Sequence, residues 1–235
     1  MTQQQYRWGG LAGIAGGALF IFVFIFVGVV VGVDTSIAAF SGIRAGRTVE
    51  ESLYLAVLIL WVAPFLSLFR ALRDASPAAA LYGSVLGVVA LGVLAAGALP
   101  HVANVAIGDL YQAPGATPAD QAVLGLVGQG IQGIIDMLLV TGLVILPLGF
   151  IGLGVAMHGA PMFGRGFGRL SVTLGVIGLA AAAVLLVDPS SPIAVVGFLV
   201  AIVFHFVMGW RLHALSRVPV QGAAMSAAVT GRSAG

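Results

Sequence analysis

Three polar residues, Gln129, Gln132 and Asp136, occur in a part of the chain that otherwise carries almost no charge. Between residues 121 and 157, Asp136 is the sole formal charge. The spacing i, i+3, i+7 places the three side chains on one face of a helix. If this helix crosses a membrane, such a stripe is suited to bind a cation, relay a proton or guide a small solute. The alternative is that the stripe faces water at the membrane boundary or hydrogen-bonds to a neighbouring helix.

The four histidines raise the question of a haem or metal site, since imidazole is a common ligand and two histidines often hold a b-type haem between membrane helices. In the membrane orientation predicted below, His101 lies at the outer end of its helix, and His158 and His213 lie at the inner ends of theirs. His205 lies one to two turns inside the same helix as His213. His158 can therefore share a level with His205 or His213. No second pair repeats at another level, so the sequence favours structural histidines and leaves haem b as an alternative.

Other catalytic chemistries lack their residues. The chain has no Cys, and all its basic residues are Arg, which excludes disulfides, thiolate sites and Schiff-base lysines. Ser84 and His205 could pair as in an intramembrane protease, but residues 82–85 lack the Gly-x-Ser-Gly context. The Gly-rich segment 164–169 has no preceding strand, so it fails as a dinucleotide fingerprint. The sequence therefore predicts no catalytic machinery, no cofactor and no nucleic-acid partner.

The composition indicates that these residues belong to a membrane protein. Hydrophobic residues make up 60% of the 235 and charged residues 8%, whereas soluble domains carry about 25% charge. So few charges cannot cover the surface of a soluble protein of this size. We expect an all-α, polytopic membrane protein.

Six charge-poor segments are long enough to cross a bilayer, which takes about 20 apolar residues. The predicted spans cover residues 8–33, 53–69, 78–99, 134–157, 170–187 and 193–210. Together they form one bundle over residues 1–217, and residues 218–235 are predicted to be a disordered tail.

Two features limit these spans. Pro100 is expected to end the third, because proline interrupts helices. The charge-poor stretch before residue 157 is too long for one crossing. We therefore expect residues 118–133 to form a re-entrant or interfacial helix, broken at Gly128-Gln129-Gly130, with one long tilted helix as the alternative.

The arginines predict the orientation, because cytoplasmic loops accumulate positive charge. With six spans, Arg44 and Arg47 fall on one side and the other eight arginines on the opposite side. Both termini are therefore predicted to be cytoplasmic. On that face, anionic lipid headgroups are expected to contact five loop arginines, namely Arg70, Arg73, Arg165, Arg169 and Arg211.

Glycines recur at four-residue spacing in two of the predicted spans, at Gly9, Gly13 and Gly17 and at Gly83 and Gly87. Small residues at this spacing let membrane helices approach closely. The pattern indicates either a dimerisation face or packing within one bundle, and the high glycine content favours the second.

Three motifs carry a family resemblance. They are the opening Arg7-Trp8-Gly9-Gly10-Leu11-Ala12-Gly13, the turn at 164–169 leading into Leu170-Ser171-Val172-Thr173-Leu174-Gly175, and the closing Trp210-Arg211-Leu212. With these motifs the chain resembles an uncharacterised bacterial family of six-helix integral membrane proteins. The resemblance implies a multi-pass protein of the bacterial inner membrane and no particular activity.

Three functions remain open. An accessory or scaffolding subunit of a membrane complex explains the lack of convergent polar chemistry, with other membrane subunits or a second copy as partner. A small-solute transporter or channel, coupled to protons or cations, would use Gln129, Gln132 and Asp136. A b-type haem protein would use His158, His205 or His213.

Overall fold

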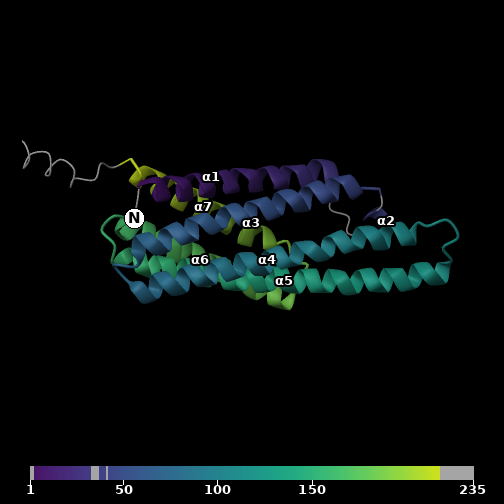
Figure 1. The fold of residues 1–235 in the computed structure, drawn as a ribbon. Helices are drawn as coiled ribbons and strands as arrows, with labels where there is room; N and C mark the ends of the chain where they lie inside the picture. The colour runs from purple at the N-terminus through teal and green to yellow at the C-terminus, as the bar shows by residue number, and fades with distance from the viewer. Residues whose placement is uncertain (1–2, 33–36, 41, 218–235) are drawn as a thin grey trace, which may run out of the picture.

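The structure is a computed structural model and describes residues 3–32, 37–40 and 42–217. Every regular element in these ranges is a helix (Figure 1). The elements are α1 (Gln3–Phe26), the π-helix η1 (Val27–Val31), α2 (Ile37–Phe40), α3 (Arg44–Leu72), α4 (Pro77–Tyr111), α5 (Pro118–His158), α6 (Gly164–Val187) and α7 (Ala194–Leu215).

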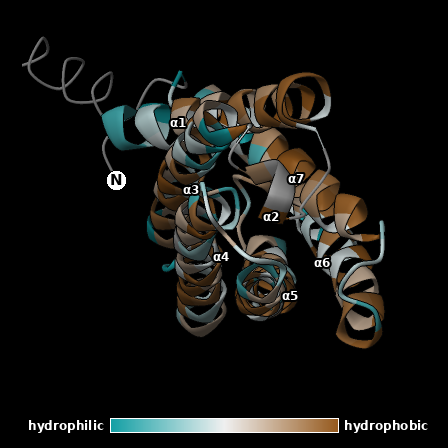
Figure 2. Ribbon diagram, turned by 90° about the vertical axis from the view of Figure 1, so that its right-hand side faces the viewer, coloured by the Kyte–Doolittle hydropathy of each residue, from teal (hydrophilic) through white to brown (hydrophobic). Residues whose placement is uncertain are grey.

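Six of the described helices, counting α1 with η1 as one, are long and apolar enough to cross a membrane. Their exposed surfaces carry many large apolar side chains, and hydrophobic residues predominate on the helices in the end-on view of Figure 2. The predicted all-α bundle of six spans is therefore confirmed. The predicted tail, residues 218–235, lies outside the described residues.

The spanning helices form a closed ring. α1 packs against α3, α3 against α4, α4 against α5, α5 against α6 and α6 against α7, and the ring closes where α7 meets α1 (Figure 2). The end of the bundle that holds the start of α1 and the end of α7 is called the proximal end, and the opposite end the distal end.

Two helices extend beyond the predicted spans at places that matter for the site, and the predicted helix end at Pro100 is wrong. α3 begins at Arg44, whereas the prediction started the second span at residue 53. α4 continues through Pro100 to Tyr111, whereas the prediction ended the third span there. A proline removes one backbone hydrogen bond, but α4 packs along α5, and this packing holds the helix together beyond the proline.

The predicted break at residues 128–130 is also wrong. α5 is one helix of 41 residues, which corresponds to about 60 Å at about 1.5 Å per residue. It begins with a capping box, in which Thr117 Oγ1 accepts a hydrogen bond from the Asp120 N–H and the Asp120 carboxylate accepts one from the Thr117 N–H. Figure 1 shows α4 and α5 extending beyond the other helices at the distal end.

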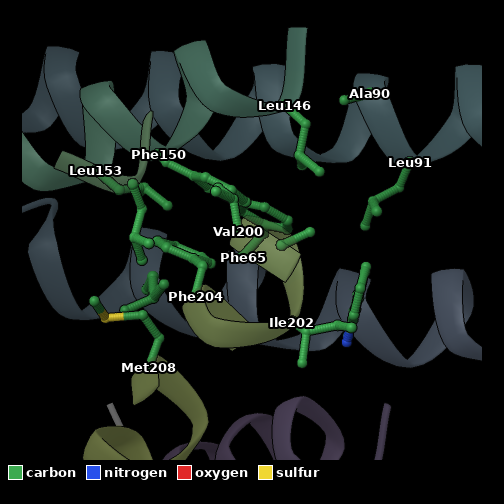
Figure 3. Close-up of a cluster of buried hydrophobic side chains, with 14 of the residues drawn as sticks. Phe65, Ala90, Leu91, Leu146, Phe150, Leu153, Val200, Ile202, Phe204 and Met208 are labelled. Atoms are coloured by element: carbon green, nitrogen blue, oxygen red, sulfur yellow. The ribbon is translucent and has the colours of Figure 1, made fainter. Parts of the chain in front are cut away.

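The core fills the ring at mid-height. Phe150 of α5 lies on Phe204 of α7 with ring centroids 3.8 Å apart, and Phe65 of α3 stacks beside both. Figure 3 shows these rings meeting between the helices, with Leu146 and Leu153 of α5 nearby. All these side chains are fully buried or nearly so.

Glycines allow the tightest helix crossings. A Cβ on Gly10 would lie 2.7 Å from the carbonyl oxygen of Gly209, so α1 and α7 touch through their backbones. A Cβ on Gly83 would lie 2.5 Å from the backbone nitrogen of Leu153, which makes the same kind of contact between α4 and α5. The glycines that sequence analysis singled out at Gly9, Gly13, Gly17, Gly83 and Gly87 all pack within this chain.

Candidate functional site

A cavity of about 220 Å³ lies inside the ring toward its distal end. Helices α1, α3, α4, α5 and α7, with η1, line it. Its walls are mainly apolar, and four aromatic side chains contribute to them, namely Phe20, Phe24, Tyr54 and Phe198. Phe198 lies one turn into α7, so the cavity sits close to the level at which this short helix begins.

Three polar side chains also line the cavity, Glu50 and Glu51 of α3 and His101 of α4. His101 Nδ1 lies 2.5 Å from Glu51 Oε1, and the two side chains are 19% and 9% exposed. Glu50 accepts a hydrogen bond of 3.0 Å from Arg47 Nη1. Arg47 and Glu51 are buried, and ionisable groups buried within spanning helices are rare outside functional sites.

Helix geometry explains why these groups meet. Arg47, Glu50 and Glu51 are spaced i, i+3, i+4, so they share one face of α3. This face turns toward α4, which packs beside α3, and Glu51 reaches His101 across the contact. The helical start of α3 at Arg44 is therefore what brings the charges into the bundle.

The short helix α2 covers part of this polar cluster. Phe40 is fully buried, and its ring lies 5.3 Å from Arg47 Cζ and 6.5 Å from the His101 ring. One turn beyond His101, Asn104 is 1% exposed, and its Oδ1 has no hydrogen-bond partner among the residues that the structure describes. His101 Nε2 is likewise buried without a partner there.

The predicted pathway residues lie on a different face of α5. Gln132 donates a hydrogen bond of 2.9 Å from Nε2 to Asp136 Oδ1. Gln129 is exposed and Asp136 half-buried. The cavity is lined instead by Ile135 and Leu139 of this helix. A pathway through the three polar residues stays a prediction.

His205 lies in the aromatic core. Its Nδ1 donates to the Ala201 carbonyl at 2.7 Å, and its ring stacks on Trp61 with centroids 4.0 Å apart. Phe65 and Phe150, from other helices, meet it in T-shaped ring contacts. A haem bound to His205 would need the space that these rings occupy.

The other two candidate haem ligands lie at the proximal end. His158 Nδ1 donates to the Gly154 carbonyl at 2.7 Å, and His213 Nε2 lies 3.0 Å from Arg217 Nη2. The structure does not bring either side chain into the aromatic packing around His205. Over the described ranges, no three His, Asp or Glu residues are arranged to hold a metal ion.

The arginines predicted to contact lipid lie at the proximal ends of α3, α6 and α7. Arg70, Arg73, Arg165 and Arg169 are exposed. Arg211 donates to the Met162 carbonyl and lies 5.2 Å from the Phe167 ring, so it is held by the protein.

Sequence reasoning missed the whole polar cluster. Glu50 and Glu51 precede the second predicted span, which begins at residue 53 where the charge-free segment starts, and His101 follows Pro100, where the third span is predicted to end. The sequence does contain a pattern that indicates the earlier helix start. Arg47, Glu50 and Glu51 are spaced i, i+3, i+4 directly before an apolar segment, which is typical of a helix that begins before that segment.

Comparison with protein families, curated proteins and solved structures finds no match for this chain. The resemblance to a six-helix bacterial family therefore depends on its three motifs alone.

Proposed function

We propose that this protein is a small-solute transporter that binds its solute in the distal cavity. The observation that carries the proposal is a cavity inside a ring of membrane-spanning helices, lined by Glu50, Glu51 and His101. Ligand sites in bundles lie between helices and combine apolar walls with a few polar groups. Buried ionisable residues in spanning helices commonly mark solute or ion pathways.

The cavity limits the size and character of the solute. At about 220 Å³ it is smaller than the pockets of about 300–1,000 Å³ that hold drug-sized ligands. The solute therefore has a small apolar body and a polar group that reaches Glu51 or His101. Of the three functions considered from sequence, transport fits best, with the binding site in the cavity.

The charge distribution suggests the orientation. We place the protein in a bacterial cytoplasmic membrane with the Arg-rich proximal end inside and anionic lipid around Arg70, Arg73, Arg165 and Arg169. The cavity then faces the outer side.

Replacing these four arginines with Gln should weaken co-purification of anionic lipid, measured by mass spectrometry of bound lipid, while unchanged lipid content would contradict this placement.

A binding experiment tests the proposed function through Trp61. Its ring meets Phe20, a cavity residue, with centroids 5.1 Å apart. Trp8 and Trp210 are exposed and can be replaced with Phe to leave Trp61 as the single reporter. In lipid nanodiscs, small aromatic solutes should then change the Trp61 emission in a saturable way, and the protein should carry the same solutes into proteoliposomes.

A cavity-filling variant supplies the control. Leu139→Phe enlarges a half-buried lining residue and should abolish the saturable change, because it takes up solute space. Leu148→Phe, at a 40% exposed position of the same helix, should leave it intact. If no solute gives a signal that Leu139→Phe removes, or if binding occurs without uptake, a transporter with its site here is excluded.

One observation favours the accessory-subunit function as a second candidate. The distal parts of α4 and α5 carry large exposed apolar residues, Leu110, Val123 and Leu126, which are 59%, 60% and 68% exposed. We propose that this exposed apolar surface contacts a partner subunit, as large exposed apolar patches do in other proteins. Val123→Ser with Leu126→Ser should release a membrane subunit that co-purifies after gentle detergent extraction, and if nothing is released, this candidate fails.

A further inference from the structure

We propose that the solute is an organic monocation, a protonated amine with a small aromatic or aliphatic body. This inference depends on the proposed function, because it names the chemical class that the distal cavity takes. It follows from the charges of the polar cluster, the aromatic walls and the unfilled hydrogen-bonding position on His101.

The charge balance of the cluster is negative. Among the described residues of the cluster, the formal charges are +1 on Arg47 and −1 each on Glu50 and Glu51, which sum to −1 with His101 counted as neutral. The nearby pair Arg44–Asp109 is balanced by itself at 2.9 Å. A buried net charge is expensive unless it is paired, so a cation in the cavity stabilises the site, whereas an anion would meet two carboxylates.

The lining selects an organic cation over a metal ion. Phe20, Phe24, Tyr54 and Phe198 line the cavity, and aromatic faces attract organic ammonium groups. Inorganic cations such as Ca²⁺ and Mg²⁺ instead need six or more oxygen ligands or retained water. The mainly apolar wall cannot provide these oxygens, but it suits the carbon body of an amine.

His101 indicates an ammonium that carries N–H groups. When its Nδ1 donates to the Glu51 carboxylate, Nε2 is an acceptor, and this atom has no partner in the described part of the chain. A protonated amine has donors for both Nε2 and a glutamate oxygen. A quaternary ammonium has none.

The test compares two probes that share a phenyl ring and a two-carbon chain, 2-phenylethylamine and 2-phenylethanol. The first is a cation at neutral pH and the second is neutral. Both are titrated into the full chain with Trp61 as single reporter in nanodiscs, and the Leu139→Phe signal is subtracted. We expect the amine to bind at least about tenfold more tightly, and Glu51→Gln to remove most of that difference, because the charge-assisted hydrogen bond is lost.

Each outcome separates the two proposals. If amine and alcohol bind equally well, the cation assignment is wrong and the proposed function stands. Binding of neither probe above the Leu139→Phe background overturns the cation assignment, and the proposed function is then decided by the wider set of small aromatic solutes. If Glu51→Gln does not fold, Glu50→Gln replaces it, because it also removes one negative charge from the cavity wall. Full retention of the amine preference in the folded variant overturns the inference.

Discussion

At the residue scale, the pair Glu51–His101 is a contact between two largely buried titratable side chains of different helices. A carboxylate that is 9% exposed meets an imidazole at 2.5 Å inside a bundle of spanning helices. A hydrogen bond to a charged group contributes about 1.5–3 kcal/mol, and a buried group that loses its partner carries the full desolvation penalty. The pair therefore stabilises the fold as well as forming the wall of the cavity.

Glu51→Ala should lower the free energy of unfolding by about 1.5–3 kcal/mol, because His101 would stay buried without its acceptor. Unfolding by SDS in mixed lipid micelles, followed by circular dichroism, measures this loss. Arg44→Ala is the matched control on the same helix. Its pair with Asp109 is 63% and 45% exposed, and exposed pairs contribute about 0–1 kcal/mol. Equal losses in the two variants would show that the buried pair has no special energetic role.

At the element scale, α4 and α5 continue through residues that usually interrupt helices. α4 contains Pro100 and α5 contains Gly128, Gly130 and Gly133. Gly128 has a packing role, since a Cβ there would lie 2.2 Å from Ile37 Cγ1 of α2. Gly130 and Gly133 face open space, so their only local effect is on helix propensity.

Gly130→Ala and Gly133→Ala should therefore each stabilise the protein by up to about 1 kcal/mol, the difference between Gly and Ala in a helix. Gly128→Ala should destabilise it by displacing Ile37. The same SDS titration measures all three. A loss of stability at residues 130 and 133 would instead support a broken, re-entrant segment.

The helix crossings give a second test at this scale. Gly10→Ala should lower the melting temperature in detergent, because its Cβ would lie 2.6–2.7 Å from backbone atoms of α7 that cannot rotate away, and overpacking costs about 1–3 kcal/mol. Gly92→Ala, which meets nothing within 4 Å, should keep or raise it. Should Gly10→Ala prove neutral, the close contact between α1 and α7 would be wrong.

At the scale of the whole molecule, the six spans and the chain direction determine the topology. The start of α1 and the end of α7 lie together, as the approach of Gly10 to His213 shows. The helices η1, α4 and α6 end toward the distal end, and α3 and α5 end toward the proximal end.

Cysteine labelling tests this topology, because the natural chain has no Cys. A membrane-impermeant maleimide added to whole cells should label Ala119→Cys and Ser190→Cys, which lie toward the distal end. Ala75→Cys, in the proximal turn after α3, should be labelled only after lysis. The reverse pattern would show that the Arg-rich end faces outward, and labelling of all three positions in intact cells would contradict six spans.

The composition and the long apolar blocks of the sequence determined that the chain lies in lipid, that it is all-helical and that it has six spans. A chain with 60% apolar residues in long blocks is not stable as a soluble protein. In lipid, its backbone N–H and C=O groups must form their hydrogen bonds within helices. The glycine spacing likewise indicated close packing within the chain. These properties follow from local sequence, because each helix satisfies its own hydrogen bonds.

The ends of the helices and the site were decided by tertiary structure. Pro100 and Gly128 weaken a helix locally, but α4, α5 and α2 pack against each other over these residues. Glu51 and His101 are 50 positions apart, and each resembles a solvent-exposed polar residue at a helix end. Only the docking of α3 on α4 places them together beside a cavity, because the energy of a buried polar contact depends on neighbours that the local sequence does not contain.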